Sequence, residues 1–140
     1  MTWKELKDNV MNLGFDEDAP SLDSTDIEDI MIVSANRAIN LIQKMLVERY
    51  ETYFKEKLKD EGWELEELKP ITANTSDTFK IEIPEKVIDL VPLLTAHYVW
   101  LDDDIAKASM YYNEYDQFRE RIEEDISRNV NLEFYGGLGW

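Results

Sequence analysis

Apolar residues recur along most of this chain at intervals of three and four, the spacing that places them on one face of a helix. The longest run predicts a helix from about Asp26 to Glu61, and Thr25 with Glu28 forms a capping box at its start. At about 1.5 Å per residue that helix would measure about 54 Å, whereas a compact domain of this size is about 37 Å across. We therefore expect the helix to project from the domain or to break near Glu48 to Tyr50.

Two shorter patterns predict helices toward the ends of the chain. Thr2 and Glu5 form a capping box for a first helix that stops at Gly14, and the acidic, proline-containing stretch 15–23 predicts a loop. A final amphipathic helix is predicted from Asp104 to about Asn129. The aspartates at its start would cap it and place negative charge at its positive end.

The middle of the chain predicts a strand followed by a buried helix. Apolar and polar residues alternate near 78–83, which favours a short strand or hairpin. The next predicted helix, Pro84 to Leu101, is apolar on most sides and is the candidate for the buried centre, with a kink expected at Pro92. The expected fold class is therefore mainly α-helical, a bundle with one long central helix and one short strand or hairpin.

The end of the chain lacks helical periodicity and combines glycines with large apolar side chains. We expect a single helical domain over residues 1–133 and an extended arm over residues 134–140. The arm could dock on a partner through its aromatic and aliphatic anchors, or fold back over its own final helix. The candidate partner-binding residues are Phe134, Tyr135, Gly136, Gly137, Leu138, Gly139 and Trp140.

Composition narrows the classes of function. A chain of 140 residues is enough for one domain, and its formal charge of -16 disfavours a protein that grips nucleic acid or an anionic membrane. The first residues carry charges where a signal peptide would be apolar, and no apolar run approaches the length of a membrane span, so we expect a soluble, unexported protein. The absence of cysteine excludes disulfides, a thiolate nucleophile and cysteine zinc sites.

Catalytic and metal-binding patterns give no positive prediction. His97 is the only histidine and lies in the apolar helix, so we expect a core or interface histidine. Leu94 stands where a di-metal helical bundle needs a glutamate, three residues before the histidine. The acidic runs 16–18 and 102–104 lack the ligand spacing of a calcium loop. We therefore predict no catalytic, cofactor or metal residues and no enzymatic activity.

Two groups of aromatic residues have different predicted roles. Tyr50, Tyr53 and Phe54 lie on the part of the long helix that would extend beyond a compact domain, so they are candidates for a subunit interface. The second group has helical spacing within the final helix and is predicted to be core. It consists of Tyr111, Tyr112, Tyr115 and Phe118.

Several segments resemble the head-to-tail adaptor (connector) proteins of tailed bacteriophages. The likeness is strongest from Phe79 to Ile122, where it includes Ile83 to Leu94, Tyr98 to Asp104 and a further group of single positions. The opening, Met1 to Phe15, and the glycine-rich aromatic end are similar to the same proteins. The single positions are Ala106, Ala108, Tyr112, Tyr115 and Arg119.

The resemblance implies a structural subunit of the virion neck that is assembled in the host cytoplasm. Such subunits form a ring, commonly a dodecamer, beneath the portal protein and contact a tail or stopper protein, while DNA passes through the channel without specific binding. Many related chains carry a β-rich insertion between the long and penultimate helices. Here only residues 62–83 occupy that place, so contacts made by the insertion should be reduced.

Two other classes of function remain open from the residues themselves. A free acidic helical regulator, such as a DNA mimic that occupies a nucleic-acid-binding site, would act as a monomer or dimer on a basic partner. A metal-dependent enzyme would hold stoichiometric metal. The strong acidity also suits a channel through which DNA slides without adhering. The native mass of the assembly separates the ring from the regulator.

Overall fold

The computed structural model describes residues 1–14, 24–60 and 69–136. Over these residues the protein is mainly helical, which confirms the expected fold class at that level. Among the described helices, none combines the length and the apolar composition needed to span a bilayer. The helices are α1 (Trp3–Gly14), α2 (Ser24–Asp60), α3 (Glu85–Ile88), α4 (Leu90–Trp100) and α5 (Ile105–Gly136).

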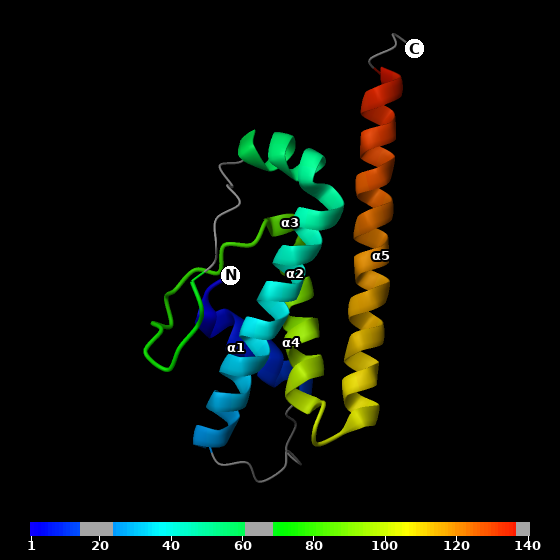
Figure 1. The fold of residues 1–140 in the computed structure, drawn as a ribbon. Helices are drawn as coiled ribbons and strands as arrows, with labels where there is room; N and C mark the ends of the chain where they lie inside the picture. The colour runs from blue at the N-terminus through cyan, green and yellow to red at the C-terminus, as the bar shows by residue number, and fades with distance from the viewer. Residues whose placement is uncertain (15–23, 61–68, 137–140) are drawn as a thin grey trace.

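Helix α4 is the centre of the fold. It contacts α1, α2, α3 and α5, and Figure 1 shows it between α2 and α5. Its apolar residues lie on every side of the helix, so neighbours on all sides are needed to cover them. This confirms the prediction of a buried central helix. The buried residues of α4 are Leu90, Val91, Pro92, Leu94, Thr95, Ala96, Val99 and Trp100.

The predicted helix from Pro84 to Leu101 is interrupted once. Helix α3 ends and α4 begins on either side of Asp89. Pro92 has no N–H to donate to the carbonyl of Ile88, and its ring crowds that carbonyl, so the disturbance falls in the turn before the proline. The kink expected at Pro92 is therefore a one-residue break at Asp89.

The long helix predicted from Asp26 to Glu61 is confirmed by α2, with small shifts at both ends. It is not broken near Glu48 to Tyr50, because α2 is one uninterrupted helix there. Figure 1 shows instead that the C-terminal part of α2 turns away from the axis of its N-terminal part, while α5 extends well beyond the end of α4. The excess length of α2 is thus accommodated by a bend, and α5 is the helix that projects (Figure 1).

The strand or hairpin predicted near 78–83 is wrong. The described residues contain only an isolated antiparallel bridge between Thr2 and Lys80. Flanking it, Trp3 N–H donates to the Phe79 carbonyl over 2.8 Å and Ile81 N–H donates to the Met1 carbonyl over 2.9 Å. A ladder needs several paired residues on each side, and here the pairing stops where α1 begins at Trp3.

The predicted extended arm is also wrong at its start. Helix α5 runs to Gly136 rather than ending near Asn129, so Phe134 and Tyr135 are helical. An existing helix gains one hydrogen bond for each residue added, so it can continue past its apolar stripe, and glycine is common at a helix C-terminus. The remainder of the expected arm, residues 137–140, lies outside the described residues.

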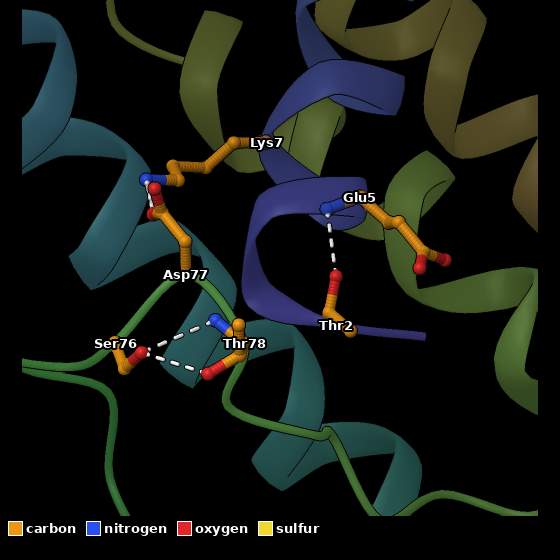
Figure 2. Close-up of polar contacts among 6 residues, drawn as sticks. All are labelled: Thr2, Glu5, Lys7, Ser76, Asp77 and Thr78. Atoms are coloured by element: carbon orange, nitrogen blue, oxygen red, sulfur yellow. Dashed lines mark hydrogen bonds and ion pairs between the residues drawn. The ribbon is translucent and has the colours of Figure 1, made fainter.

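Two predicted helix caps are present. The Thr2 side chain accepts a hydrogen bond from Glu5 N–H over 3.2 Å at the start of α1, as Figure 2 shows. The Asp104 carboxylate accepts one from Lys107 N–H over 3.1 Å at the start of α5. Each cap satisfies a backbone donor that has no partner within its own helix.

Candidate interaction surface

Polar contacts hold the connection before α3 against the helices. Asn36 of α2 binds the backbone of Ile71 on both sides: its amide group donates to the Ile71 carbonyl, and its oxygen accepts from the Ile71 N–H, each over 2.9 Å. Figure 2 shows Lys7 of α1 reaching Asp77, with 2.8 Å between the ammonium nitrogen and a carboxylate oxygen. The Ser76 and Thr78 hydroxyls lie 2.9 Å apart beside this ion pair.

A row of side chains crosses from α2 over α4 to α5. The guanidinium of Arg37 lies over the Tyr98 ring, 4.4 Å from its centre. The Tyr98 and His97 ring centres are 5.0 Å apart, and those of His97 and Tyr112 are 5.1 Å apart. Tyr112 is followed at 5.8 Å by the buried Tyr115. All these ring pairs are tilted, an arrangement that aromatic rings favour over a face-to-face sandwich.

Exposed apolar side chains lie beside this row. Val33 and Leu41 are one helical turn before and after Arg37, so they share its face of α2, and they are 65% and 42% exposed. Ile105 lies two turns before Tyr112 on the same face of α5, and these residues are 72% and 43% exposed. We call this surface the aromatic strip; it comprises Val33, Arg37, Leu41, His97, Tyr98, Ile105 and Tyr112.

His97 joins two of the helices in the strip. Its Nδ1 lies 2.8 Å from the Ala108 carbonyl oxygen of α5. Since a carbonyl only accepts, Nδ1 must carry the proton and donate it. The ring is partly buried at the contact between α4 and α5. The bond therefore fixes the ring in place and ties α4 to α5.

An ion-pair network borders the strip on α5. Arg119 pairs with Asp116 at 2.6 Å and with Glu123 at 2.7 Å. The hydrogen bond with Asp116, supported by that with Glu123, raises the pKa of Arg119, so its charge is constant. Burial raises the pKa of Tyr115, against the opposing effect of the Arg119 charge. Tyr115 thus remains a neutral phenol at this end of the strip.

The strip differs in charge from the rest of the chain. None of its residues is acidic and it includes the cationic Arg37, whereas the whole chain has a formal charge of -16. Within the part of the chain that the structure describes, no group of three His, Asp or Glu side chains is arranged to hold a metal ion. The chemistry on the strip is that of a binding surface, with apolar area and one planar cation.

The interface candidates Tyr50, Tyr53 and Phe54 all lie in the C-terminal part of α2, and their side chains are outside the described part. The partner-binding candidates divide between the end of α5 and the residues beyond it. Phe134, Tyr135 and Gly136 belong to α5, whereas Gly137, Leu138, Gly139 and Trp140 lie outside the description.

The core assignment of the aromatic residues in the final helix is only partly right. Tyr111 and Tyr115 are buried, and Tyr111 donates a hydrogen bond to the Leu13 carbonyl, which joins α5 to α1. Phe118 is partly buried against the core. Tyr112 is exposed instead. Its helical spacing is the same as that of its buried neighbours, so the sequence carries no signal that separates Tyr112 from the core stripe.

Comparisons with protein-family models, with curated proteins and with solved structures find no match for this chain.

Proposed function

We propose that this chain is a structural subunit of a head-to-tail adaptor ring in a tailed bacteriophage, located in the virion neck between the portal and a tail or stopper protein. The sequence resemblance from Phe79 to Ile122 carries the proposal. That segment includes α3, α4 and the first half of α5, which are the central elements of the fold. The role is structural and requires no cofactor and no catalytic group.

The shape of the subunit supports assembly. Helix α5 extends well beyond α4, and α2 bends at the same end of the molecule (Figure 1). A helix that leaves its own core presents surface that neighbouring subunits can cover, and repeated contacts between different surfaces close into a ring when the rotation allows it. The C-terminal part of α2, with Tyr50, Tyr53 and Phe54, is the proposed contact at that end.

The charge of the chain supports a channel for DNA. With a formal charge of -16 per subunit, a homo-oligomeric ring, proposed to be a dodecamer, would surround DNA with acidic groups. Phosphates would be repelled, so DNA could slide without the salt-dependent grip that clustered lysine and arginine produce. Genomic DNA would therefore cross the ring without specific binding.

The end of the chain is the proposed contact with the portal protein. Because α5 runs to Gly136, the proposed docking element consists of the last turn of α5, which contains Phe134 and Tyr135, followed by residues 137–140. Burying one aromatic side chain in the portal would stabilise the docked state by about 4 kcal/mol. This is less than the conformational entropy that is lost when several residues of the chain end become ordered. Several anchors must therefore dock together, and a ring benefits because many copies engage one partner ring.

Native mass spectrometry and electron microscopy of the full chain, alone and with the portal protein encoded by the same genome, test the proposal. We expect closed rings with a central channel, at least when the portal is present. Removing residues 134–140 should abolish portal attachment and leave the subunit folded, and removal of 137–140 alone shows how much the last turn of α5 contributes. A chain that stays monomeric or dimeric with the portal and binds a basic protein instead would favour the DNA-mimic regulator.

A further inference from the structure

We propose that the aromatic strip is one half of a contact between two copies of this chain, and that its other half is the acidic outer face of α5 on the next copy. This inference rests on the proposed function, because it locates the contact between neighbouring subunits of the ring. It is distinct from the contact proposed for the C-terminal part of α2. The strip is formed by the N-terminal part of α2 together with α4 and the start of α5.

The apolar content of the strip requires a partner. Single exposed apolar residues are common on protein surfaces. Here Val33, at 65% exposure, shares a helix face with Arg37, and Ile105, at 72%, shares one with Tyr112. Ring contacts join Arg37 to Tyr112 through Tyr98 and His97 across three helices. Such a surface, with an arginine and tyrosines among aliphatic residues, has the composition of the energetic centre of an interface.

The charges of two surfaces of this chain fit a second copy as the partner. Two molecules that each carry -16 repel one another over most of their surfaces. The residues of the strip include no carboxylate and present the cationic Arg37, so a contact made through them avoids adding to this repulsion. The Arg37 guanidinium is stacked on Tyr98 and exposed, so its N–H edges are available for a carboxylate.

The complementary surface lies on α5 away from the core. Glu114, Glu120 and Glu124 are exposed there, and the exposed Arg121 lies among them, so the three carboxylates outnumber one cation. Met110, which is 47% exposed, lies one turn before Glu114 on the same face and adds apolar area. We call Met110, Glu114, Glu120 and Glu124 the acidic face. The strip of one copy can place Arg37 against these carboxylates and its aliphatic residues against Met110.

The contact must join different surfaces of the two copies. A symmetric contact of strip with strip would bring Arg37 near its counterpart and leave both guanidinium groups without an anion. A contact of strip with acidic face leaves a free strip at one end of a pair and a free acidic face at the other. Further copies can then add until the assembly closes, which is the geometry of a ring.

Sedimentation velocity over a range of concentrations, with and without the portal protein, tests the strip in the full chain. We expect Ile105→Ser, Val33→Ser and Arg37→Glu each to raise the dissociation constant of self-association by about tenfold or more. The matched control is Leu13→Ser, which removes another exposed apolar side chain outside the strip and should change the constant less than about twofold. Thermal melts followed by circular dichroism check that each variant is folded.

A mixing experiment tests the pairing of different surfaces. One variant carries Ile105→Ser and Val33→Ser, and the other carries Glu114→Lys, Glu120→Lys and Glu124→Lys. Each alone should stay monomeric, whereas a mixture should form heterodimers, because the intact strip of the second variant meets the intact acidic face of the first. If the mixture contains only monomers, the proposed pairing of the strip with the acidic face is wrong.

A photo-reactive benzoylphenylalanine at position 105 identifies the occupant directly, and we expect a cross-linked product of two chains. A cross-link to the portal, or rings from strip variants that match the wild type, would overturn this inference and leave the adaptor proposal standing. A wild-type chain that remains monomeric at every concentration, with and without portal, would overturn both.

Discussion

Helix α4 and the connection of residues 69–83 are adjacent in the chain but are held in place by different forces. α4 is buried because its apolar side chains point in all directions and four helices cover them. The connection is held by hydrogen bonds at a few points, among them Asn36 with Ile71 and the N-terminal backbone with Phe79 and Ile81. The hydrophobic effect has no directional requirement, whereas each of these hydrogen bonds depends on two particular groups.

The hydroxyl groups of the two regions show the same difference. Thr95 in α4 is fully buried, and its Oγ1 has no hydrogen-bond partner among the described residues. In the connection, the Thr75 hydroxyl accepts from Thr72 N–H over 2.8 Å and the Ser76 hydroxyl lies 2.9 Å from that of Thr78. Apolar packing around α4 therefore outweighs the cost of one unpaired hydroxyl, while the connection depends on its polar groups.

The largest expected effect is in α4. Leu94 is fully buried between the surrounding helices, so Leu94→Ala removes apolar contact and leaves a cavity. We expect the free energy of unfolding, measured by urea titration, to fall by about 2–5 kcal/mol. Leu93→Ala is the matched control, because Leu93 is only partly buried and should cost less. A loss at position 94 no greater than that at position 93 would contradict the central place of α4.

The next effect tests the connection. Asn36→Ala removes both hydrogen bonds to Ile71, whose backbone groups then lose their partners beside a buried side chain. We expect a loss of about 2–3 kcal/mol in the free energy of unfolding. Asn40→Ala, at an exposed position of the same helix, should change it by less than about 0.5 kcal/mol. Equal effects of the two substitutions would show that the hydrogen bonds between Asn36 and Ile71 do not hold the connection.

A smaller effect of opposite sign is expected at Thr95. Thr95→Val replaces an unpaired buried hydroxyl with a methyl group of the same shape, so the free energy of unfolding should rise by about 1 kcal/mol. Thr95→Ser keeps the hydroxyl and loses the methyl group, and it should lower stability by about 1 kcal/mol. If urea titration shows that the valine variant is the less stable of the two, the hydroxyl must have a partner in solution.

The same contrast explains how much of the fold could be predicted. α2 and α4 were predictable because apolar periodicity is a local property of the chain. The helix caps at Thr2 and Asp104 are local as well. The segment 78–83 has the alternation of a strand, and its burial follows that alternation at Ile81 and Ile83. Whether it becomes a strand depends on a partner far away in the chain, and its pairing with Thr2 stops at one bridge because α1 begins at Trp3.

The aromatic strip could not be predicted for a related reason. Arg37, Tyr98 and Tyr112 lie on three different helices, and only the packing of α2 and α5 on α4 brings them together. Helical spacing within α5 assigned Tyr112 to the core together with Tyr111 and Tyr115. The spacing of apolar residues does not show where the buried face of a helix stops and the exposed face begins. The exposed edge becomes visible only when the neighbouring helices are placed.

The smallest expected effect is at the ion pair that joins the connection to α1. The hydrogen bond from the Lys7 ammonium group, with the charge of Lys7 and then of Lys4, lowers the pKa of the Asp77 carboxyl. Since the pKa is lower in the folded protein, the pair stabilises the fold above the ordinary aspartate pKa, and this contribution is lost as the pH falls through the folded-state value. Asp77 is largely exposed, so solvent screens the pair and the effect on unfolding should be small.

The pKa itself is therefore the sharper measurement, by NMR titration of the Asp77 carboxyl. Lys7→Ala should return it most of the way to the ordinary aspartate value, because both the hydrogen bond and the nearest charge are removed. Lys4→Ala should move it less, since Lys4 acts only through its more distant charge. In about 1 M salt, where charges are screened beyond about 3 Å, the Lys4 effect should vanish and that of Lys7 should persist in part. An Asp77 pKa that responds equally to the two substitutions would mean that the Lys7 side chain does not bond this carboxylate. The connection would then be joined to α1 here only by backbone bonds, such as that from Lys4 N–H to the Asp77 carbonyl over 3.1 Å.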